Sequence, residues 1–250
     1  DKLEKNNIKF KSTTWKRNQK KDEGGGEYRI LENGKIFEKV GVNFSKVYGK
    51  FPKQFQKKIP GADKDPRFWA SGISVVMHMK NPLIPAMHFN TRYISTTYDW
   101  FGGGMDVTPS KKDENEKKEF HKILKDMCDR HNKNYYTKYK KWCDQYFYLT
   151  HRKEPRGIGG IFFDYKKKNF EKDFKFVRDV GVTFQLIFNK IISKKLKKKW
   201  NDKDKEIQYI KRGRYTEFNL LYDRGTKFGL QTGGNVEGIL MSLPPLAKWK

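Results

Sequence analysis

Polar and apolar side chains alternate along the stretch MHFNTRY, in the first half of the chain. If this stretch is a β-strand, His88, Asn90 and Arg92 project from the same face, because successive side chains of a strand point to opposite faces. Ser74 and His78 share a face on the preceding β-rich stretch, and they would join this row if the two strands pair. Such a row of polar side chains could form a proton-transfer site. The same alternation is more often found where one face of an edge sheet is exposed to solvent, and the spacing alone favours that second interpretation.

A carboxylate lies just after three consecutive glycines in the stretch WFGGGMDVTP. Glycines permit backbone conformations closed to other residues and let a flat ligand approach the main chain. The carboxylate of Asp106 can accept hydrogen bonds from ligand N–H groups and stabilise positive charge that develops in a reaction. A tight turn in which Asp106 caps the following segment explains the same residues equally well.

Four histidines lie near these polar stretches and would form a metal site if folding brought them together. They are His78, His88, His121 and His151. None of them has HxH or HExxH spacing, so the sequence carries no metal-site signature. The GIGG segment at residues 157–160 does not indicate a dinucleotide site, because the IFFDY that follows reads as a strand rather than as a helix.

The net charge of +26 would ordinarily suggest a nucleic acid or an anionic membrane as partner. Most of the basic residues are lysines, and many of these lie in short runs between apolar segments, which is typical of a solvated surface. Several arginines instead lie in glycine- and aromatic-rich segments, where a guanidinium can hold a carboxylate with two hydrogen bonds. These are Arg92, Arg152, Arg156, Arg212, Arg214 and Arg224. We therefore expect an acidic small molecule as ligand and no nucleic-acid partner.

The first half of the chain predicts strands followed by helices. After a polar N-terminal arm over residues 1–14, alternating residues predict a hairpin that turns at Asn33 and Gly34. A second, central hairpin is expected within residues 68–98. The period then changes to three and four, which predicts two helices within residues 113–149 with a break near Asn132.

The second half predicts a strand, a long helix and further strands. GIGGIFFDY reads as a strand, and apolar residues from Val177 to Ile191 repeat with a helical period. The stretches YTEFNLLYD and TKFGLQTG predict another hairpin, joined through Arg224 and Gly225. Strands and helices without regular βαβ alternation indicate an α+β fold.

The length of 250 residues favours one large domain, and no apolar run approaches the roughly 20 residues that span a bilayer. The two cysteines, Cys128 and Cys143, lack CxxC spacing and indicate a reducing compartment. We therefore expect a cytoplasmic protein without a transmembrane segment. Because the chain does not start with methionine, the mitochondrial intermembrane space is the alternative if an upstream targeting segment was removed.

Several ordered segments together resemble the oxygen-dependent coproporphyrinogen III oxidase family. They are GVNFSKVYG, SVVMHMKNP, HFNTRYI, WFGGGMDVTP, KKWCDQYFYLTHRKEPRGIGGIFFDY and GRYTEFNLLYDRGTKFGLQTGGNVEGILMSLPPLAKW. The resemblance implies a single catalytic domain over residues 15–250, with a large antiparallel β-sheet flanked by helices on both faces. It also implies a homodimer to which the segment from Tyr215 onward contributes.

The activity that the resemblance implies is the oxidative decarboxylation of two propionates of coproporphyrinogen III to vinyl groups, giving protoporphyrinogen IX in haem synthesis. Molecular oxygen is the co-substrate and electron acceptor, and no organic cofactor is required. The family's proposed roles make His88 the proton donor and Asp106 the central carboxylate. A divalent metal held by the four histidines named above is a further possibility that the resemblance raises.

The substrate-contacting residues follow from the same motifs and from the arginines. They are Ser74, Asn90, Thr91, Arg92, Gly233, Gly234 and Asn235, together with Arg212, Arg214 and Arg224. Asn235 departs from the family pattern, in which an arginine follows the two glycines, so we expect Arg212 or Arg214 to supply the missing fork donor. Members of the family also continue past LPPLAKW, so we expect this to be a partial chain.

Two functions of other classes stay open on the residues alone. A basic nucleic-acid-binding protein would show strongly salt-dependent binding that does not depend on Asp106. An iron-dependent oxygenase with a histidine site would consume oxygen only with its metal present.

Overall fold

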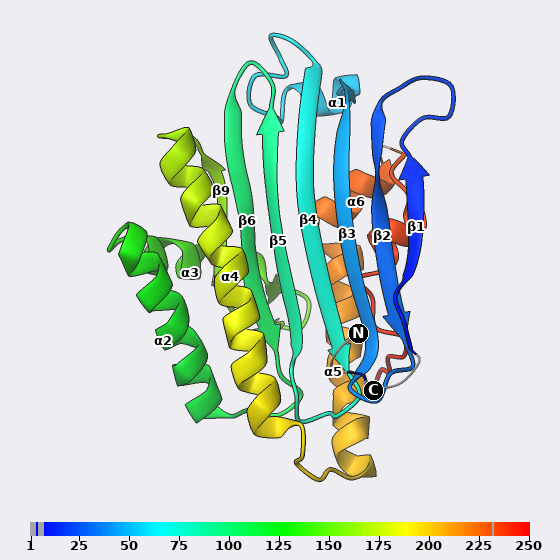
Figure 1. The fold of residues 1–250 in the computed structure, drawn as a ribbon, viewed down its shortest axis with the longest axis vertical. Helices are drawn as coiled ribbons and strands as arrows, with labels where there is room; N and C mark the ends of the chain where they lie inside the picture. Colours follow the sequence, from blue (N-terminus) through cyan, green and yellow to red (C-terminus); the bar gives the residue numbers. More distant parts are fainter. Residues whose placement is uncertain (1–3, 5–7, 232) are drawn as a thin grey trace.

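A seven-stranded antiparallel sheet dominates the computed structural model, which describes residue 4, residues 8–231 and residues 233–250 (Figure 1). Its strands lie in the order β1-β2-β3-β4-β5-β6-β9, so that all but the last are neighbours in sequence. The strands are β1 (Lys11–Lys16), β2 (Gly24–Glu32), β3 (Phe37–Lys50), β4 (Arg67–Met79), β5 (Ala86–Ser95), β6 (Asp99–Thr108) and β9 (Gly160–Lys166). A separate small hairpin comprises β7 (Tyr148–Leu149) and β8 (Glu154–Pro155).

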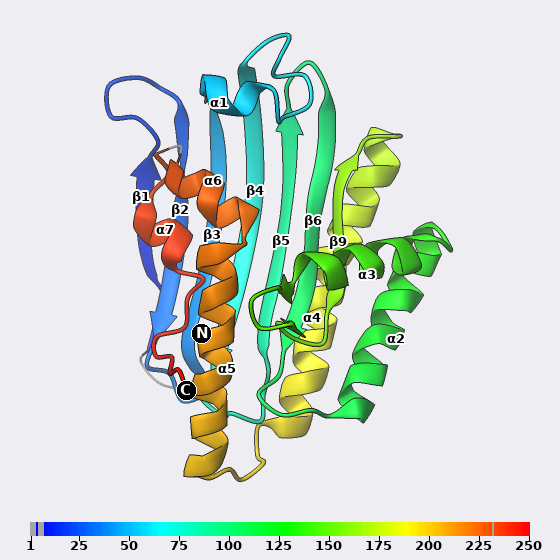
Figure 2. The ribbon, with the colours of Figure 1, turned by 180° about the vertical axis from the view of Figure 1, so that it is seen from behind.

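Helices cover both faces of this sheet, which confirms the predicted α+β architecture. The helices are α1 (Lys53–Gln56), α2 (Glu114–His131), α3 (Tyr135–Tyr146), α4 (Phe170–Lys195), α5 (Asp202–Leu221), α6 (Arg224–Gln231) and α7 (Val236–Leu240). Figures 1 and 2 show α4 on one face and α5, α6 and α7 on the other, which we call the α4 face and the α5 face. Within the described ranges, no helix is both long and apolar enough to cross a membrane.

The first two predicted hairpins and the helix break are confirmed. β2 and β3 pair around Asn33, whose φ of 60° is the left-handed conformation that asparagine tolerates in a turn. β4 and β5 form the central hairpin. The helical stretch breaks between α2, which ends at His131, and α3, which begins at Tyr135.

The hairpin predicted after Tyr215 is wrong, because these residues form α5 and α6. α5 begins with a capping box in which the side chains of Asn201 and Asp204 bond each other's backbone N–H groups. Its buried side chains follow a helical period, but most of them are polar. They include Asp204, Gln208, Arg212, Tyr215 and Asn219. A pattern of apolar residues therefore could not reveal this helix.

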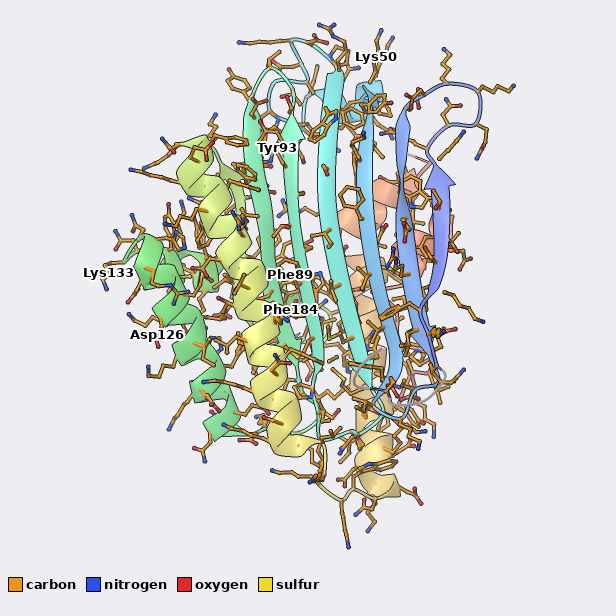
Figure 3. The ribbon with its side chains drawn as sticks, in the orientation of Figure 1. Lys50, Phe89, Tyr93, Asp126, Lys133 and Phe184 are labelled. Carbon is orange, nitrogen blue, oxygen red and sulfur yellow. The ribbon has the colours of Figure 1, made fainter. Side chains whose placement is uncertain are left out.

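The main hydrophobic core lies on the α4 face. Phe89 of β5 stacks on Phe184 of α4 with ring centroids 5.2 Å apart, and Figure 3 shows the two rings facing each other. Asp126 and Lys133, by contrast, point outward at the edge occupied by α2. Because this core occupies the α4 face, the polar residues that alternate with it along each strand are left for the α5 face.

Candidate active site

The strand register brings the predicted polar row together on the α5 face. Asn90 of β5 lies opposite Ser74 of β4, and His88 lies opposite both Val76 of β4 and Asp106 of β6. Directly paired residues of antiparallel strands point to the same face, so these side chains are neighbours. β4 and β5 are interior strands of the sheet, and the side chains of Ser74, His88, Asn90 and Arg92 are partly buried, so this row is not a fully exposed face.

Asp106 lies inside strand β6 and not in a turn, so the alternative of a turn cap is wrong. Its side chain is only 3% exposed, whereas that of His88 is 16% exposed. Two strand positions before it, Gly104 allows β9 to approach closely, because a Cβ at this position would collide with the carbonyl oxygen of Ile161. Gly104 thus serves the packing of β6 against β9. Of His88 and Asp106, only His88 is exposed enough for a ligand to reach.

Both carboxylate oxygens of Asp106 are engaged. Oδ1 is 2.7 Å from Nδ1 of His88, and Oδ2 accepts a hydrogen bond from Nη2 of Arg156, a residue that is itself 3% exposed. Burial by itself raises the pKa of Asp106, but the positive charge of Arg156 and the hydrogen bond from His88 outweigh it, so that the pKa lies below its usual value. Asp106 is therefore held as a carboxylate between two donors.

The tautomer of His88 follows from this carboxylate. An ionised carboxylate only accepts hydrogen bonds, so Nδ1 of His88 carries a hydrogen. In the neutral ring Nε2 then presents a lone pair, and the side-chain amide of Asn90 lies 3.3 Å from it. This nitrogen can accept a proton, and Asp106 stabilises the resulting imidazolium.

Arg156 is a site residue that the sequence prediction did not include. It lies just after β8, and its Nη1 donates to Oδ1 of Asn219 at 3.1 Å. Three aromatic rings surround its guanidinium, those of Phe147, Tyr215 and Phe218, at 4.1, 4.4 and 4.8 Å from ring centroid to Cζ. The sequence feature that could have identified Arg156 is its position directly before GIGG, since it is one of the arginines in glycine-rich segments.

The side-chain oxygens of Asn43 and Asn90 are buried near this cluster and have no hydrogen-bond partner among the described residues. Register pairs Asn43 of β3 with Ser74 and Ser74 with Asn90, so the two amides flank the serine in one row across the sheet. Unpaired buried acceptors are uncommon and call for a partner. Asn43 was not predicted as a site residue either, although it lies in GVNFSKVYG, one of the segments that resemble the family.

The other residues of the predicted NTR triplet divide between the two faces. Arg92 shares the α5 face with Asn90 and donates to Asp164 at 2.6 Å, while its side chain stays 32% exposed. Thr91 lies between them in the strand and points to the α4 face, because neighbouring strand residues alternate. Thr91 can therefore meet a ligand on the α5 face only through its backbone.

The remaining predicted arginines are already paired. Arg212 is buried and donates to Glu38 at 2.8 Å, and Arg214 donates to Glu154 at 3.2 Å. The guanidinium of Arg224 lies over the ring of Tyr146, 5.0 Å from its centroid. Replacement of the missing fork donor by Nη2 of Arg212 would require breaking its ion pair with Glu38.

The segment Gly233, Gly234 and Asn235 joins α6 to α7. Gly233 has a φ of 73°, which favours glycine, and the backbone N–H of Gly234 bonds the carbonyl of Gly229 at 2.9 Å. The side chain of Asn235 caps α7 by accepting from the N–H of Gly238 at 2.8 Å. Asn235 thus has a local structural task in this chain.

The four candidate histidines do not form a common site. Nε2 of His78 lies 2.9 Å from the carbonyl of Ser242, and Nε2 of His121 lies 2.9 Å from that of Ile158. His151 contacts Glu217 and Tyr222, and His88 contacts Asp106. Among the described residues, no group of three or more potential ligands can hold a metal ion. The histidines therefore do not fit the shared metal site that the sequence raised.

Comparisons with known proteins agree with one another. The family profile described as coproporphyrinogen III oxidase matches residues 1–250. An oxygen-dependent coproporphyrinogen-III oxidase of Rickettsia bellii (strain RML369-C) is 57% identical over 242 residues, which is 96% of this chain and 85% of that protein. The protein of the same name from Rickettsia akari (strain Hartford) is 57% identical over 243 residues, which is 97% of this chain and 86% of that protein.

Proposed function

This chain belongs to the coproporphyrinogen III oxidase family, and from that premise we propose that it converts two propionate side chains of coproporphyrinogen III to vinyl groups with molecular oxygen as oxidant. For each side chain, a C–H bond at the carbon next to the pyrrole and the carbon–carboxylate bond both break, a carbon–carbon double bond forms, and carbon dioxide leaves. Two electrons pass to oxygen, which is reduced to hydrogen peroxide. The product, protoporphyrinogen IX, belongs to haem synthesis.

The observation that carries this proposal is the partly exposed His88, which contacts the buried Asp106, which in turn pairs with the buried Arg156. The proton that must be removed from or returned to the macrocycle is exchanged at Nε2 of His88. Asp106 orients the ring and stabilises its protonated form, and Arg156 keeps Asp106 ionised. Asp106 thus acts mainly through His88.

The acceptors and cations of the α5 face suit the chemistry of the substrate. A porphyrinogen presents four pyrrole N–H donors and carries carboxylates at its rim. We assign Asn43 and Asn90 as acceptors for pyrrole N–H groups, because their side-chain oxygens lack partners. Ser74 lies between them, and the partly exposed Arg92 is placed to meet a carboxylate.

Assembly, cofactor use and location form part of the same proposal. A homodimer through α5, α6 and α7 is supported by exposed apolar side chains on these helices, namely Leu220, Leu221, Leu230 and Val236. Oxygen is the only co-substrate and no organic cofactor takes part. Since the relatives are bacterial proteins, we propose that the enzyme works in the cytoplasm.

A single assay tests the reaction. The protein is incubated with coproporphyrinogen III in air, under nitrogen, and in air with a metal chelator, and the porphyrin products are separated after oxidation. We expect turnover in air with or without the chelator, and none under nitrogen. No product from a folded sample in air would refute the proposed activity, and loss of activity with the chelator would instead favour a metal-dependent oxygenase.

A further inference from the structure

A small cavity of about 10 Å³ lies where the end of β4, the end of β6 and the middle of α5 meet. His78 contributes from β4, Thr108 from β6, and Arg212 from α5. All three residues are more than nine-tenths buried, with 1%, 6% and 4% exposure respectively. The cavity adjoins the site described above through Tyr215, whose ring contacts both His78 and the guanidinium of Arg156.

Within the part of the chain that the structure describes, each of these three residues has one buried polar atom without a hydrogen-bond partner. The atoms are Nδ1 of His78, Oγ1 of Thr108 and Nη1 of Arg212. A second polar atom of each of the two larger side chains is bonded: Nε2 of His78 to the carbonyl of Ser242, and Nη2 of Arg212 to Glu38. Buried polar atoms are rarely left unpaired, so three on residues that line one cavity indicate a common partner.

The chemistry of the three atoms defines that partner. A carbonyl oxygen only accepts hydrogen bonds, so Nε2 of His78 carries the hydrogen and Nδ1 of the neutral ring is an acceptor. Burial keeps this ring neutral, because it lowers the pKa of His78 to about 3. Arg212 can only donate, and the hydroxyl of Thr108 can do either. The partner must therefore both donate and accept.

A simple anion cannot donate to Nδ1 of His78, and a metal cation would meet the positive charge of Arg212. A water molecule satisfies both requirements, and the cavity volume is close to the roughly 10–15 Å³ that one water needs. We propose that His78, Thr108 and Arg212 together bind a single buried water molecule. This inference does not depend on the proposed enzymatic activity.

The water bridges two strands of the sheet to helix α5. Its three bonds join β4, β6 and α5, and α5 carries the Tyr215 and Asn219 that hold Arg156. His78 is thereby a structural residue of the sheet–helix contact and not a metal ligand. The water helps to fix α5 against the sheet, at the end where Arg156 meets Asp106.

A crystal structure of the full chain, grown without added metal and then soaked with Mn²⁺ or Zn²⁺, tests the site directly. We expect density for one water within about 2.7–3.2 Å of Nδ1 of His78, Oγ1 of Thr108 and Nη1 of Arg212, and no anomalous signal there after soaking. An empty cavity, or a metal or anion in this position, would overturn the proposal.

A matched pair of variants provides an independent measurement in solution. Thr108→Val keeps the shape of the side chain but removes one partner of the water, so we expect its Tm to fall by at least about 2 °C. Thr14→Val, at an exposed position of β1, is the control and should stay close to wild type. Equal Tm values for the two variants would contradict a bound water at Thr108.

Discussion

At the residue scale, the pairing of Asp106 with Arg156 links catalysis to stability. Both side chains are buried, so each provides the charge that makes burial of the other tolerable. Removing one partner leaves an uncompensated charge in the interior, which typically costs about 3–5 kcal/mol. Replacing both by neutral groups of similar shape removes that penalty, although it also removes the carboxylate that orients His88.

We therefore expect Asp106→Asn to lose most of its turnover and to lower the free energy of unfolding by about 3–5 kcal/mol. The double variant Asp106→Asn/Arg156→Gln should regain part of this stability but no activity. Urea unfolding and the turnover assay, applied to both variants and to Arg156→Gln, measure the coupling between the two residues. Additive effects on stability would show that the two charges do not interact.

His78 makes the stability of the fold depend on pH. Its folded pKa is lowered by burial from 6.5 to about 3, so the unfolded chain binds a proton in this window and the folded chain does not. The stabilisation is present above pH 6.5 and is lost as the pH falls toward about 3, with a slope of up to about 1.4 kcal/mol per pH unit. In His78→Phe this contribution should disappear. Urea unfolding of both proteins between pH 7 and about 5 compares the slopes, and parallel slopes would exclude a buried neutral His78.

Asn43 offers a test of substrate contact by a residue outside the catalytic cluster. If its side-chain oxygen accepts a pyrrole N–H, Asn43→Ala should raise KM about 5- to 10-fold and leave kcat nearly unchanged, because the bond is present in both ground and transition states. Asn115→Ala, at an exposed position of α2, serves as control. An unchanged KM would remove Asn43 from the substrate site.

At the scale of elements, the carboxylate of Glu217 joins the β7–β8 hairpin to helix α5, in addition to the pair between Glu154 and Arg214. Glu217 accepts hydrogen bonds from His151 at 2.7 Å, from Arg152 at 2.7 and 3.0 Å, and from Trp249 at 2.9 Å. These hydrogen bonds lower the pKa of Glu217 to about 2, and the bond from Arg152 makes the largest contribution. Arg156 lies at the end of the same hairpin, so Glu217 is a positioning residue for the Asp106 partner.

Glu217→Gln weakens the charge-assisted bonds to Arg152 and should let the hairpin shift. Because small displacements of catalytic groups cost large factors in rate, we expect kcat to fall at least about tenfold with little change in KM. Glu206→Gln on the same helix is the control, since Glu206 pairs with Lys248 at the surface. If both variants turned over substrate at the wild-type rate, the hairpin would not need this contact.

At the scale of the whole molecule, two exposed apolar surfaces compete as the dimer interface. One lies on α5 to α7 and includes Leu221 and Val236, and the other lies on the α4 face of β3 and β4 and includes Phe44 and Ile73. The proposed homodimer uses the first. Leu221→Lys should therefore yield a monomer by analytical ultracentrifugation, whereas Ile73→Lys should remain dimeric. The reverse result would place the interface on the α4 face.

Much of the fold could be predicted from local patterns. The period of two in β2 to β5 and the apolar period of α2 and α4 are carried by neighbouring residues, and the structure confirms the elements predicted from them. Helix α5 could not be predicted in the same way, because most of its buried side chains are polar, among them Gln208, Arg212 and Asn219. Polar residues are buried there only because Glu38, Met79 and Arg156 of distant segments satisfy them.

The sequence by itself determined the family, through its ordered motifs, and the shared face of His88, Asn90 and Arg92, through strand alternation. Only the tertiary structure showed that Asp106 lies within a strand, that Arg156 neutralises it, and that the candidate metal-binding histidines have separate partners. The physical reason is that alternation acts between adjacent residues, whereas the charge state of Asp106 depends on a guanidinium 50 positions away. Packing of α5 and the β7–β8 hairpin brings that charge to the sheet.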